Sequence, residues 1–292
     1  MYDVIIIGKG PAGISASLYT LRASLNTLII SKNDSVLGKA KKIENYYGFE
    51  HPISGEKLLD EGEKQSLRLG AQIIHDEVIK IEKTDVFKVS TPTNTYRCSA
   101  VLLATGQKTE QIKIENLSAF EGKGVSYCST CDGFFYKNLK VGVLGFKDYA
   151  IHEAMELKAY TNNITLYTNG NEPSVSEEFK NYLTNFKINK KKVLKLMGDE
   201  FLQKLYFDDQ TYEDIDGIFV AYDTASSVDF ARKLGIIIEN NSVVVDSNQE
   251  TNLKGVFAAG DCTGGFKQIS TAVGQGAIAG KKIIDYIRSI KN

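Results

Sequence analysis

The chain has 292 residues, 42% of them hydrophobic and 24% charged, and its formal net charge is −1. This length allows two domains, and near neutrality gives no reason to expect a nucleic-acid partner. No apolar run reaches transmembrane length, and the first residues enter a strand pattern without a signal peptide. Together with four cysteines, which suit a reducing compartment, these features predict a cytoplasmic protein with no membrane partner.

The N-terminal residues carry the pattern of a dinucleotide-binding unit. An apolar stretch at 3–8 predicts a buried parallel strand, and a helical stretch reaches about Ser24. Between them lies the glycine turn Gly8-Lys9-Gly10-Pro11-Ala12-Gly13, and a second apolar strand follows at Thr27–Ile30. A strand, a glycine turn, a helix and a strand in this order are the context that the dinucleotide fingerprint requires.

Each glycine of the turn has a separate task in that fingerprint. Gly8 permits the tight turn, Gly10 lets the backbone approach a pyrophosphate, and Gly13 lets helix and strand pack closely. The positive end of the helix dipole faces the phosphates in such a unit. The alternative is a glycine-containing turn without a ligand. The usual acidic ribose partner is missing, because the second strand ends at Ser31-Lys32.

Further elements predict that the same domain is completed near the C-terminus. Residues 56–70 have helical periodicity, and strand-like segments follow at Gln72–Ile74, Val78–Glu82, Phe87–Ser90 and Ala100–Ala104. Residues 255–261 predict a strand that runs into Gly260-Asp261, ahead of a helix with small residues. An aspartate at such a strand end can bind a ribityl or ribose hydroxyl, or it can cap the next helix.

The middle of the chain partly repeats the beginning. Its predicted strands and helices alternate, at Val141–Gly145, Asp148–Tyr160, Ile164–Thr168, Ser174–Phe186 and Ile215–Ala221. We therefore predict an α/β protein with two Rossmann-like, three-layer domains, the second inserted in the first. The first domain is expected at residues 1–113 and 242–292, and the central domain at residues 114–241.

The segment Cys128-Ser129-Thr130-Cys131-Asp132-Gly133 is the strongest chemical signal. Two cysteines at this spacing can close a reducible disulfide, and an acid after the second can manage a proton there. The alternatives are half a zinc site or a structural disulfide. Zinc needs more ligands, whereas Cys98 and Cys262 are isolated, and so short a disulfide loop would constrain little chain entropy. We interpret the pair as redox-active and expect no metal.

The chain resembles the low-molecular-weight thioredoxin reductase family along nearly its whole length. The matching landmarks occur in the family's order: Gly8–Gly13, Glu44-Asn45, Ala104-Thr105-Gly106, Cys128–Gly133 with Phe134-Phe135, Gly217–Ala221 and Gly255–Asp261. The resemblance implies FAD in the outer domain, a redox disulfide on the central domain, thioredoxin as substrate, and a homodimer.

The same resemblance implies the roles of individual residues. Cys131 exchanges electrons with the flavin, Cys128 attacks the disulfide of thioredoxin, and Asp132 donates and accepts the proton, with a loop cap as its alternative role. At position 267, where this chain has lysine, the family usually has arginine. The implied flavin contacts are Gly8, Gly10, Pro11, Ala12, Gly13, Ser31, Lys39, Asn45, Val78, Ala104, Thr105, Gly106, Gly260, Asp261, Lys267, Gln268 and Ile269.

The departures from the family concern its nicotinamide site. Where NADPH-using relatives have a second glycine fingerprint, the chain reads Gly145-Phe146-Lys147-Asp148-Tyr149-Ala150. Thr168-Asn169-Gly170 replaces the residues that grip the 2′-phosphate, and Tyr222-Asp223-Thr224-Ala225 replaces a later glycine-histidine segment. Losing two or three charged hydrogen bonds of about 1.5–3 kcal/mol each costs roughly two to six decades of affinity. We predict that this site is lost; a tolerant or NADH-specific variant is the alternative.

This combination resembles the ferredoxin-dependent flavin thioredoxin reductases, which keep FAD and the disulfide without the NADPH motifs. Plant-type ferredoxins lie near −400 mV and thioredoxin near −270 mV, so transfer of two electrons is downhill by roughly 6 kcal/mol. We therefore predict that reduced ferredoxin supplies the electrons for thioredoxin. The alternatives are another donor, an oxygen-dependent dithiol oxidase that runs the disulfide in the opposite direction, and a non-catalytic redox sensor that binds FAD.

Two basic clusters could steer an acidic ferredoxin. Their alternative is an ordinary solvated face. One comprises Lys39, Lys41 and Lys42, and the other comprises Lys187, Lys190, Lys191, Lys192 and Lys195.

Overall fold

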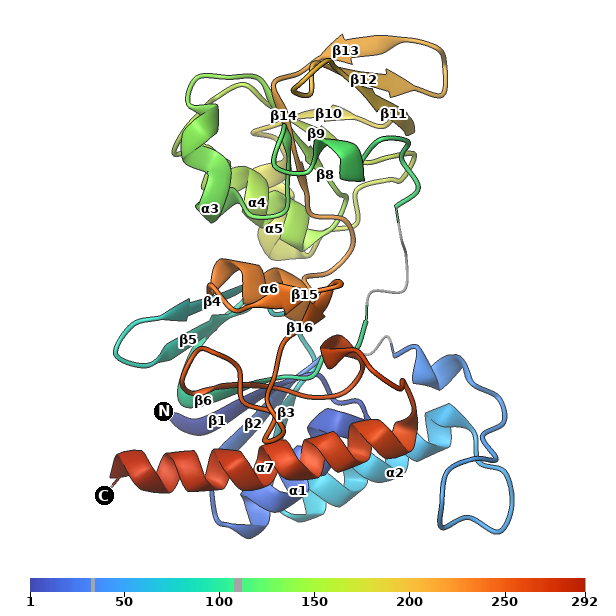
Figure 1. Cartoon of the computed structure of the whole chain (residues 1–292), viewed down its shortest axis with the longest axis vertical. Helices are drawn as coiled ribbons and strands as arrows, with labels where there is room; N and C mark the ends of the chain where they lie inside the picture. The colour runs from blue at the N-terminus through green and yellow to red at the C-terminus, as the bar shows by residue number, and fades with distance from the viewer. Residues whose placement is uncertain (33–34, 108–111, 292) are drawn as a thin grey trace. The chain divides into compact units, whose positions relative to one another are not determined.

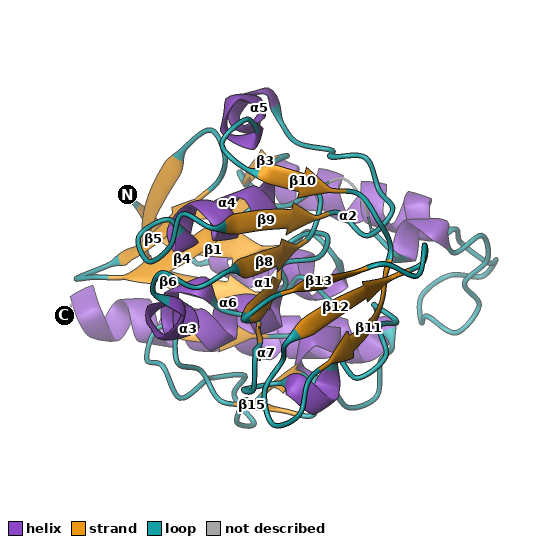
Figure 2. Cartoon of the chain, turned by 90° about the horizontal axis from the view of Figure 1, so that it is seen from above, coloured by secondary structure: helices purple, strands orange, loops and turns teal. Residues whose placement is uncertain are grey.

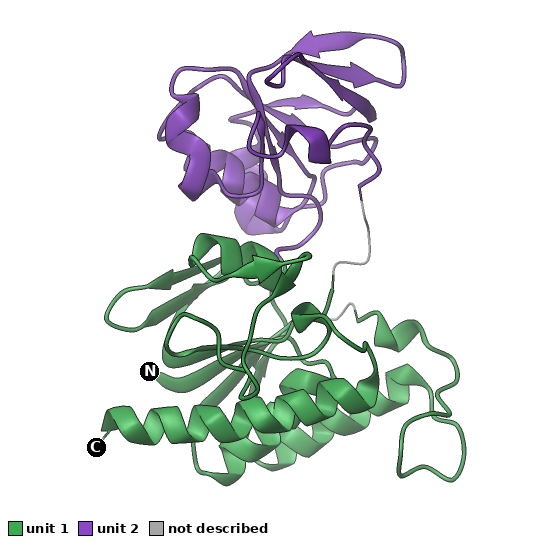
Figure 3. Cartoon of the chain, viewed as in Figure 1, with its two compact units in different colours: residues 1–109, 226–292 green, residues 110–225 purple. Residues whose placement is uncertain are grey.

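The computed structural model describes residues 1–32, 35–107 and 112–291 (Figure 1). The chain divides into two compact units (Figure 3): unit 1 comprises Met1–Thr109 and Ser226–Asn292, and unit 2 comprises Glu110–Ala225. Residues 226–241, predicted to belong to the inserted domain, cluster with unit 1. One reason is that the hydroxyls of Ser227 and Thr105 lie 2.8 Å apart, which ties this segment to the end of a unit 1 strand.

The main sheet of unit 1 has the strand order β3-β2-β1-β6-β5-β4, with β17 beside β6. Because β1, β2, β6 and β17 run parallel, their carboxyl ends meet at one edge. The strands of this unit are β1 (Tyr2–Ile7), β2 (Thr27–Ile30), β3 (Gln72–Ile74), β4 (Lys80–Lys83), β5 (Phe87–Ser90), β6 (Thr95–Leu103), β17 (Val256–Ala258) and the short pair β15 (Ile238–Glu239) and β16 (Ser242–Val243).

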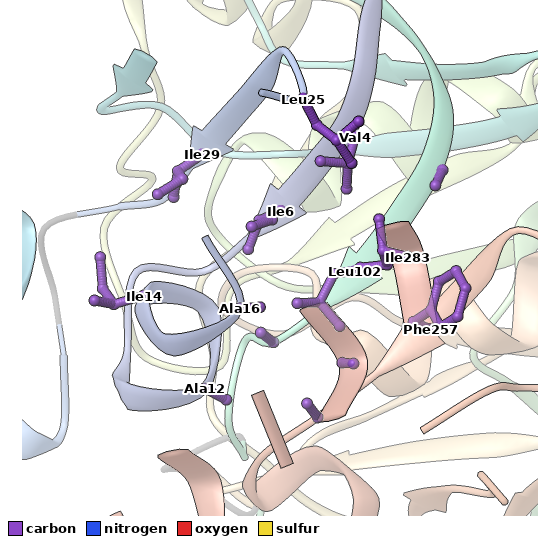
Figure 4. Packing of buried hydrophobic residues seen from close by; sticks show 14 of the residues in the cluster. Val4, Ile6, Ala12, Ile14, Ala16, Leu25, Ile29, Leu102, Phe257 and Ile283 are labelled. Carbon is purple, nitrogen blue, oxygen red and sulfur yellow. The ribbon is translucent and has the colours of Figure 1, made fainter. Parts of the chain in front are cut away.

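Helices α1 (Pro11–Arg22), α2 (Gly55–Arg68) and α7 (Ile269–Lys291) cover one face of this sheet (Figure 1), and α1 and α7 build the core of unit 1 with it. Small residues let α7 pack closely on α1, because a Cβ at Gly276 would lie only 2.2 Å from the carbonyl oxygen of Ala12. Figure 4 shows Ile6, Leu102 and Ile283 directed into the same buried cluster. The helices are α1 (Pro11–Arg22), α2 (Gly55–Arg68), α6 (Ser227–Lys233) and α7 (Ile269–Lys291), with 3-10 turns η1 (Leu37–Lys39) and η4 (Asp261–Thr263).

Unit 2 contains a second parallel sheet, ordered β10-β9-β8-β14-β7, and an antiparallel meander of β11, β12 and β13. Figure 2 shows β10, β9 and β8 side by side. The strands are β7 (Val125–Ser126), β8 (Val141–Leu144), β9 (Ile164–Tyr167), β10 (Lys187–Asn189), β11 (Val193–Met197), β12 (Lys204–Phe207), β13 (Tyr212–Asp214) and β14 (Gly217–Val220). The helices are α3 (Ser129–Asp132), α4 (Asp148–Leu157) and α5 (Glu177–Leu183), with 3-10 turns η2 (Ser118–Phe120) and η3 (Gly133–Tyr136).

Among the residues that the structure describes, no helix combines the length and the apolar character needed to cross a membrane.

Candidate active site

The predicted glycine turn lies at the carboxyl edge of the unit 1 sheet, directly after β1. Gly8 has a φ of +110°, and a Cβ there would lie 2.3 Å from the carbonyl oxygen of Ala104. A Cβ on Gly13 would lie 1.9 Å from the carbonyl oxygen of Gly8. At Gly10, by contrast, a Cβ would meet no described atom within 4 Å. The turn is therefore closely packed at Gly8 and Gly13, whereas the space next to Gly10 is open.

The start of α1 fits a phosphate group in that open space. Gly10 is the N-cap residue and contributes no side-chain cap, and Pro11 opens the helix. The first amide groups of a helix need acceptors, and the helix dipole favours an anion there. Gly10, Pro11 and Ile269 also line a cavity of about 650 Å³. The pyrophosphate-binding role of the turn stays a prediction.

Other predicted flavin residues lie at the same edge of the sheet. Ser31 follows β2, Ala104–Gly106 follows β6, and Gly260-Asp261 follows β17. Burial raises the pKa of the Asp261 carboxyl, while the nearby charge of Lys267 opposes that shift. Strands far apart in sequence thus bring these segments to one place, as expected for parallel strands.

Two predicted segments outside the strands meet through side chains. Asn45 Nδ2 donates a hydrogen bond to Gln268 Oε1 at 2.9 Å, and Lys267 Nζ donates to Gln107 Oε1 at 2.7 Å. Val78 is buried, whereas Lys39 is exposed on η1. The structure therefore places Asn45 beside the segment 267–269.

Three residues of this edge were missed in the sequence. Buried Glu77 forms an ion pair with Lys32, so a carboxylate reaches the end of β2 although neither Ser31 nor Lys32, directly after the strand, is acidic. The backbone amide of Ser227 donates to Thr105 Oγ1 at 2.9 Å, and Gln275 Oε1 accepts from the amide of Gly260 at 2.8 Å. None of the three lies near its partner in the chain, so no local pattern could reveal it.

The two predicted redox cysteines form a disulfide in unit 2, with their Cα atoms 5.3 Å apart. Cys128 is the N-cap residue of α3, and its Sγ accepts a hydrogen bond from the amide of Cys131 at 3.1 Å. Such a donor stabilises negative charge on sulfur once the disulfide is reduced. Cys128 is only 4% exposed, whereas Cys131 is exposed on the surface of its unit.

Asp132 is held close to this disulfide through a serine. Ser126 Oγ donates to Asp132 Oδ2 at 2.6 Å and accepts from the amide of Cys128 at 3.1 Å. The aromatic residues that follow, Phe134 and Phe135, are exposed. The carboxylate is thus fixed relative to the Cys128 backbone, which suits a proton donor and acceptor at the disulfide. Ser126 carried no signal in the sequence.

The remaining cysteines are unsuited to disulfide exchange. Cys98 and Cys262 are free and buried, and burial raises their thiol pKa values to about 12 and about 11, respectively. A protonated, inaccessible thiol is a poor nucleophile. Reactive sulfur chemistry is therefore confined to the Cys128–Cys131 pair.

Side chains contact one another at the carboxyl end of the unit 2 sheet, where a nicotinamide nucleotide would be expected to bind. The Phe146 ring packs edge-on against Tyr222, with ring centroids 5.3 Å apart. Lys147 Nζ forms an ion pair with Asp223, and Tyr222 OH accepts from Asn171 Nδ2 at 2.9 Å. The loops after β8, β9 and β14 are therefore bonded to one another by residues that replace the family's phosphate-binding groups.

The family model described as pyridine nucleotide-disulphide oxidoreductase matches residues 2–276. The chain belongs to this family. Thioredoxin reductases of this family bind FAD, which confirms the predicted cofactor. Their two Rossmann-like domains confirm the predicted fold class.

Individual relatives align with this chain over nearly its full length. Thioredoxin reductase of Listeria innocua is 32% identical over 306 residues, with 100% of this chain and 95% of the relative covered. The solved structure of the atypical thioredoxin reductase TRi from Desulfovibrio vulgaris Hildenborough is 40% identical, with 99% of both chains covered and a TM-score of 0.96. A ferredoxin-flavin thioredoxin reductase from Clostridium acetobutylicum is 29% identical, with 99% and 98% covered and a TM-score of 0.74.

Replacing the turn glycines should separate folding from cofactor retention. Gly13→Ala is expected to lower the stability of the FAD-free chain by about 1–3 kcal/mol or more, because its Cβ would collide with the carbonyl of Gly8. It should also reduce FAD content. Gly10→Ala has open space and should leave the FAD-free chain as stable as wild type, yet lose FAD, if a phosphate occupies that space.

Thermal unfolding of the FAD-free proteins and the ratio of flavin to protein absorbance measure the two effects. Full FAD retention by Gly10→Ala would contradict the assignment of the pyrophosphate to this turn.

Proposed function

We propose that this chain is a thioredoxin-disulfide reductase that takes its electrons from reduced ferredoxin rather than from NADPH. The observation that carries the choice of donor is the set of side-chain contacts at the carboxyl end of the unit 2 sheet. There, Phe146 packs on Tyr222 and Lys147 pairs with Asp223. The full-length similarity to thioredoxin reductases supports the substrate, and the similarity to a ferredoxin-flavin thioredoxin reductase supports the donor.

The unit 1 edge would hold FAD through residues of this chain. The first turn of α1, with Gly10 and Pro11, would hold the pyrophosphate, and Asp261 would bind a ribityl hydroxyl. Asn45, Thr105 and the segment 267–269 would face the remainder of the cofactor. When bound, FAD accepts electrons singly and delivers them as a pair to a disulfide, which suits a one-electron donor.

The disulfide chemistry follows from the residues around α3. Two electrons and two protons convert the Cys128–Cys131 disulfide to two thiols. Cys128 is only 4% exposed while the disulfide is closed, so its sulfur has to become accessible after reduction. The Cys128 thiolate then attacks the disulfide of thioredoxin, forms a mixed disulfide, and releases a thiolate that takes up a proton. The Cys131 thiolate attacks Cys128 Sγ, restores the internal disulfide, and releases the second thiol of thioredoxin. Asp132, held by Ser126, is placed to supply and recover protons in both steps.

The structure bears on the two basic clusters proposed to steer ferredoxin. Lys190, Lys191 and Lys195 form ion pairs with Glu172 at 2.6 Å, Asp209 at 2.7 Å and Glu115 at 3.2 Å, so their charge is largely offset. Lys39 and Lys41 lie exposed near Asn45 in the chain. Lys42 is paired in the same way, with Glu44 at 2.7 Å. We therefore assign steering to Lys39 and Lys41.

Reduced ferredoxin is expected to drive thiol formation on thioredoxin under anaerobic conditions, with two ferredoxins consumed per thioredoxin. The measurement is thiol appearance with a ferredoxin-reducing system, and ferredoxin is omitted as the control. The rate should fall as salt shortens the Debye length to several ångströms, because screening weakens steering between opposite charges. Lys41→Glu should slow the ferredoxin-dependent rate several-fold, whereas Lys190→Glu should change it little.

No ferredoxin-dependent thiol formation across several ferredoxins would reject this donor. Hydrogen peroxide production with a dithiol substrate would instead favour the oxidase, and turnover with a different reductant would favour a reductase with another donor.

A further inference from the structure

A buried carboxylate lies beneath the disulfide loop. Glu153, on α4, is 2% exposed. Its Oε2 accepts hydrogen bonds from both donors of Ser129, from the backbone amide at 3.2 Å and from Oγ at 2.8 Å. Ser129 directly follows Cys128 and is the first residue of α3. One carboxylate oxygen therefore holds the residue next to the buried redox cysteine.

A histidine completes this cluster on the other side of the carboxylate. His152 Nδ1 lies 3.2 Å from Glu153 Oε1, and its Nε2 lies 3.7 Å from Glu156 Oε1. Burying a carboxylate is costly unless donors surround it. Ser129 supplies two such donors, and His152 adds a third in the tautomer that carries a proton on Nδ1, so the cluster can keep a negative charge one peptide unit away from Cys128.

We infer that Glu153 is a positioning residue that tunes the reduction potential of the Cys128–Cys131 disulfide. Two electrons and two protons from a dithiol reductant convert this disulfide to two thiols, and Cys128 then gains thiolate character. A nearby buried negative charge on Glu153 disfavours that thiolate, while the hydrogen bonds that Ser129 donates to Glu153 offset part of this charge. The inference rests on the proposed function in that the disulfide must cycle between its two states.

Two variants should shift the potential in opposite directions. Glu153→Gln keeps an oxygen that can accept from Ser129 but removes the negative charge. The equilibrium constant for reduction of the disulfide should therefore rise about tenfold, which corresponds to a reduction potential about 30 mV more positive. Ser129→Ala keeps the charge but removes one of its donors, so the potential should become more negative. Glu156→Gln is the matched control on the same helix: its side chain is 31% exposed, and we expect no more than about a twofold change.

The potentials are measured by equilibrating the FAD-loaded proteins in dithiothreitol redox buffers at one pH and alkylating the thiols for counting. Opposite shifts support the inference. Unchanged potentials overturn it, and so do shifts of both variants in one direction, which would indicate only a loosened loop. If Glu153→Gln does not fold, Ser129→Ala decides, since anything but a negative shift overturns the inference. A wild-type disulfide that dithiothreitol cannot reduce would instead reject the proposed function.

Discussion

A Cys128→Ser variant is expected to reduce thioredoxin at no measurable rate, and Cys131→Ser should fail equally. Exchange needs one sulfur to attack thioredoxin and a second to resolve the mixed disulfide. Cys98 and Cys262 cannot substitute, because both are buried and burial raises their pKa values to about 12 and about 11. Both variants should still fold and retain FAD, since the disulfide closes a very short loop and contributes little chain entropy.

Thiol formation on thioredoxin, with ferredoxin as the donor, measures the loss. Thr130→Ala, at an exposed position between the two cysteines, is the control and should keep most of the activity. Absorbance separates the roles of the cysteines. If Cys131 faces the flavin, Cys128→Ser should show a long-wavelength charge-transfer band and Cys131→Ser should lack it. Bands in the reverse pattern would exchange the two roles, and residual turnover in either variant would refute a two-cysteine mechanism.

Several short strands of unit 1 could be predicted from the sequence to the residue. The parallel strand Thr27–Ile30 and the antiparallel strand Phe87–Ser90 have the bounds expected, because apolar or alternating runs of β-branched and aromatic residues favour strands. The meander of β11, β12 and β13 was missed. Its strands alternate buried and exposed positions, so lysines, tyrosines and acids interrupt the apolar pattern over residues 193–214.

In the candidate site, too, the residues that could be predicted are those whose role depends on their neighbours in the chain. The tasks assigned to Gly8 and Gly13 agree with the structure, because they follow from backbone sterics within one turn and its adjoining strand. Glu77, Ser227 and Glu153 were not predicted, although each contacts a site residue or its neighbour. Their partners come from other elements, and a polar residue by itself does not show what it will contact after folding.

Millimolar NADPH or NADH is expected to leave the flavin almost fully oxidised. A nucleotide at the unit 2 sheet would have to displace the Phe146 ring from Tyr222 and break the ion pair between Lys147 and Asp223. It would then find Thr168-Asn169-Gly170 in place of charged phosphate ligands. Two or three missing charged hydrogen bonds alone cost roughly two to six decades of affinity, before any cost of opening the loops.

Anaerobic stopped-flow absorbance tests this expectation, with dithionite showing that the same flavin can be reduced. A Phe146→Gly, Lys147→Gly variant provides a sharper control. It introduces glycine at the two positions where NADPH-using relatives have it and removes the Phe146 and Lys147 side chains, but it supplies no ligand for a 2′-phosphate. We expect it to respond to NADPH and NADH weakly and about equally, since the contact that distinguishes them is still absent. Rapid, saturable bleaching of the wild-type flavin at micromolar NADPH would show that the nicotinamide site works, and the case for ferredoxin would then lose its main support.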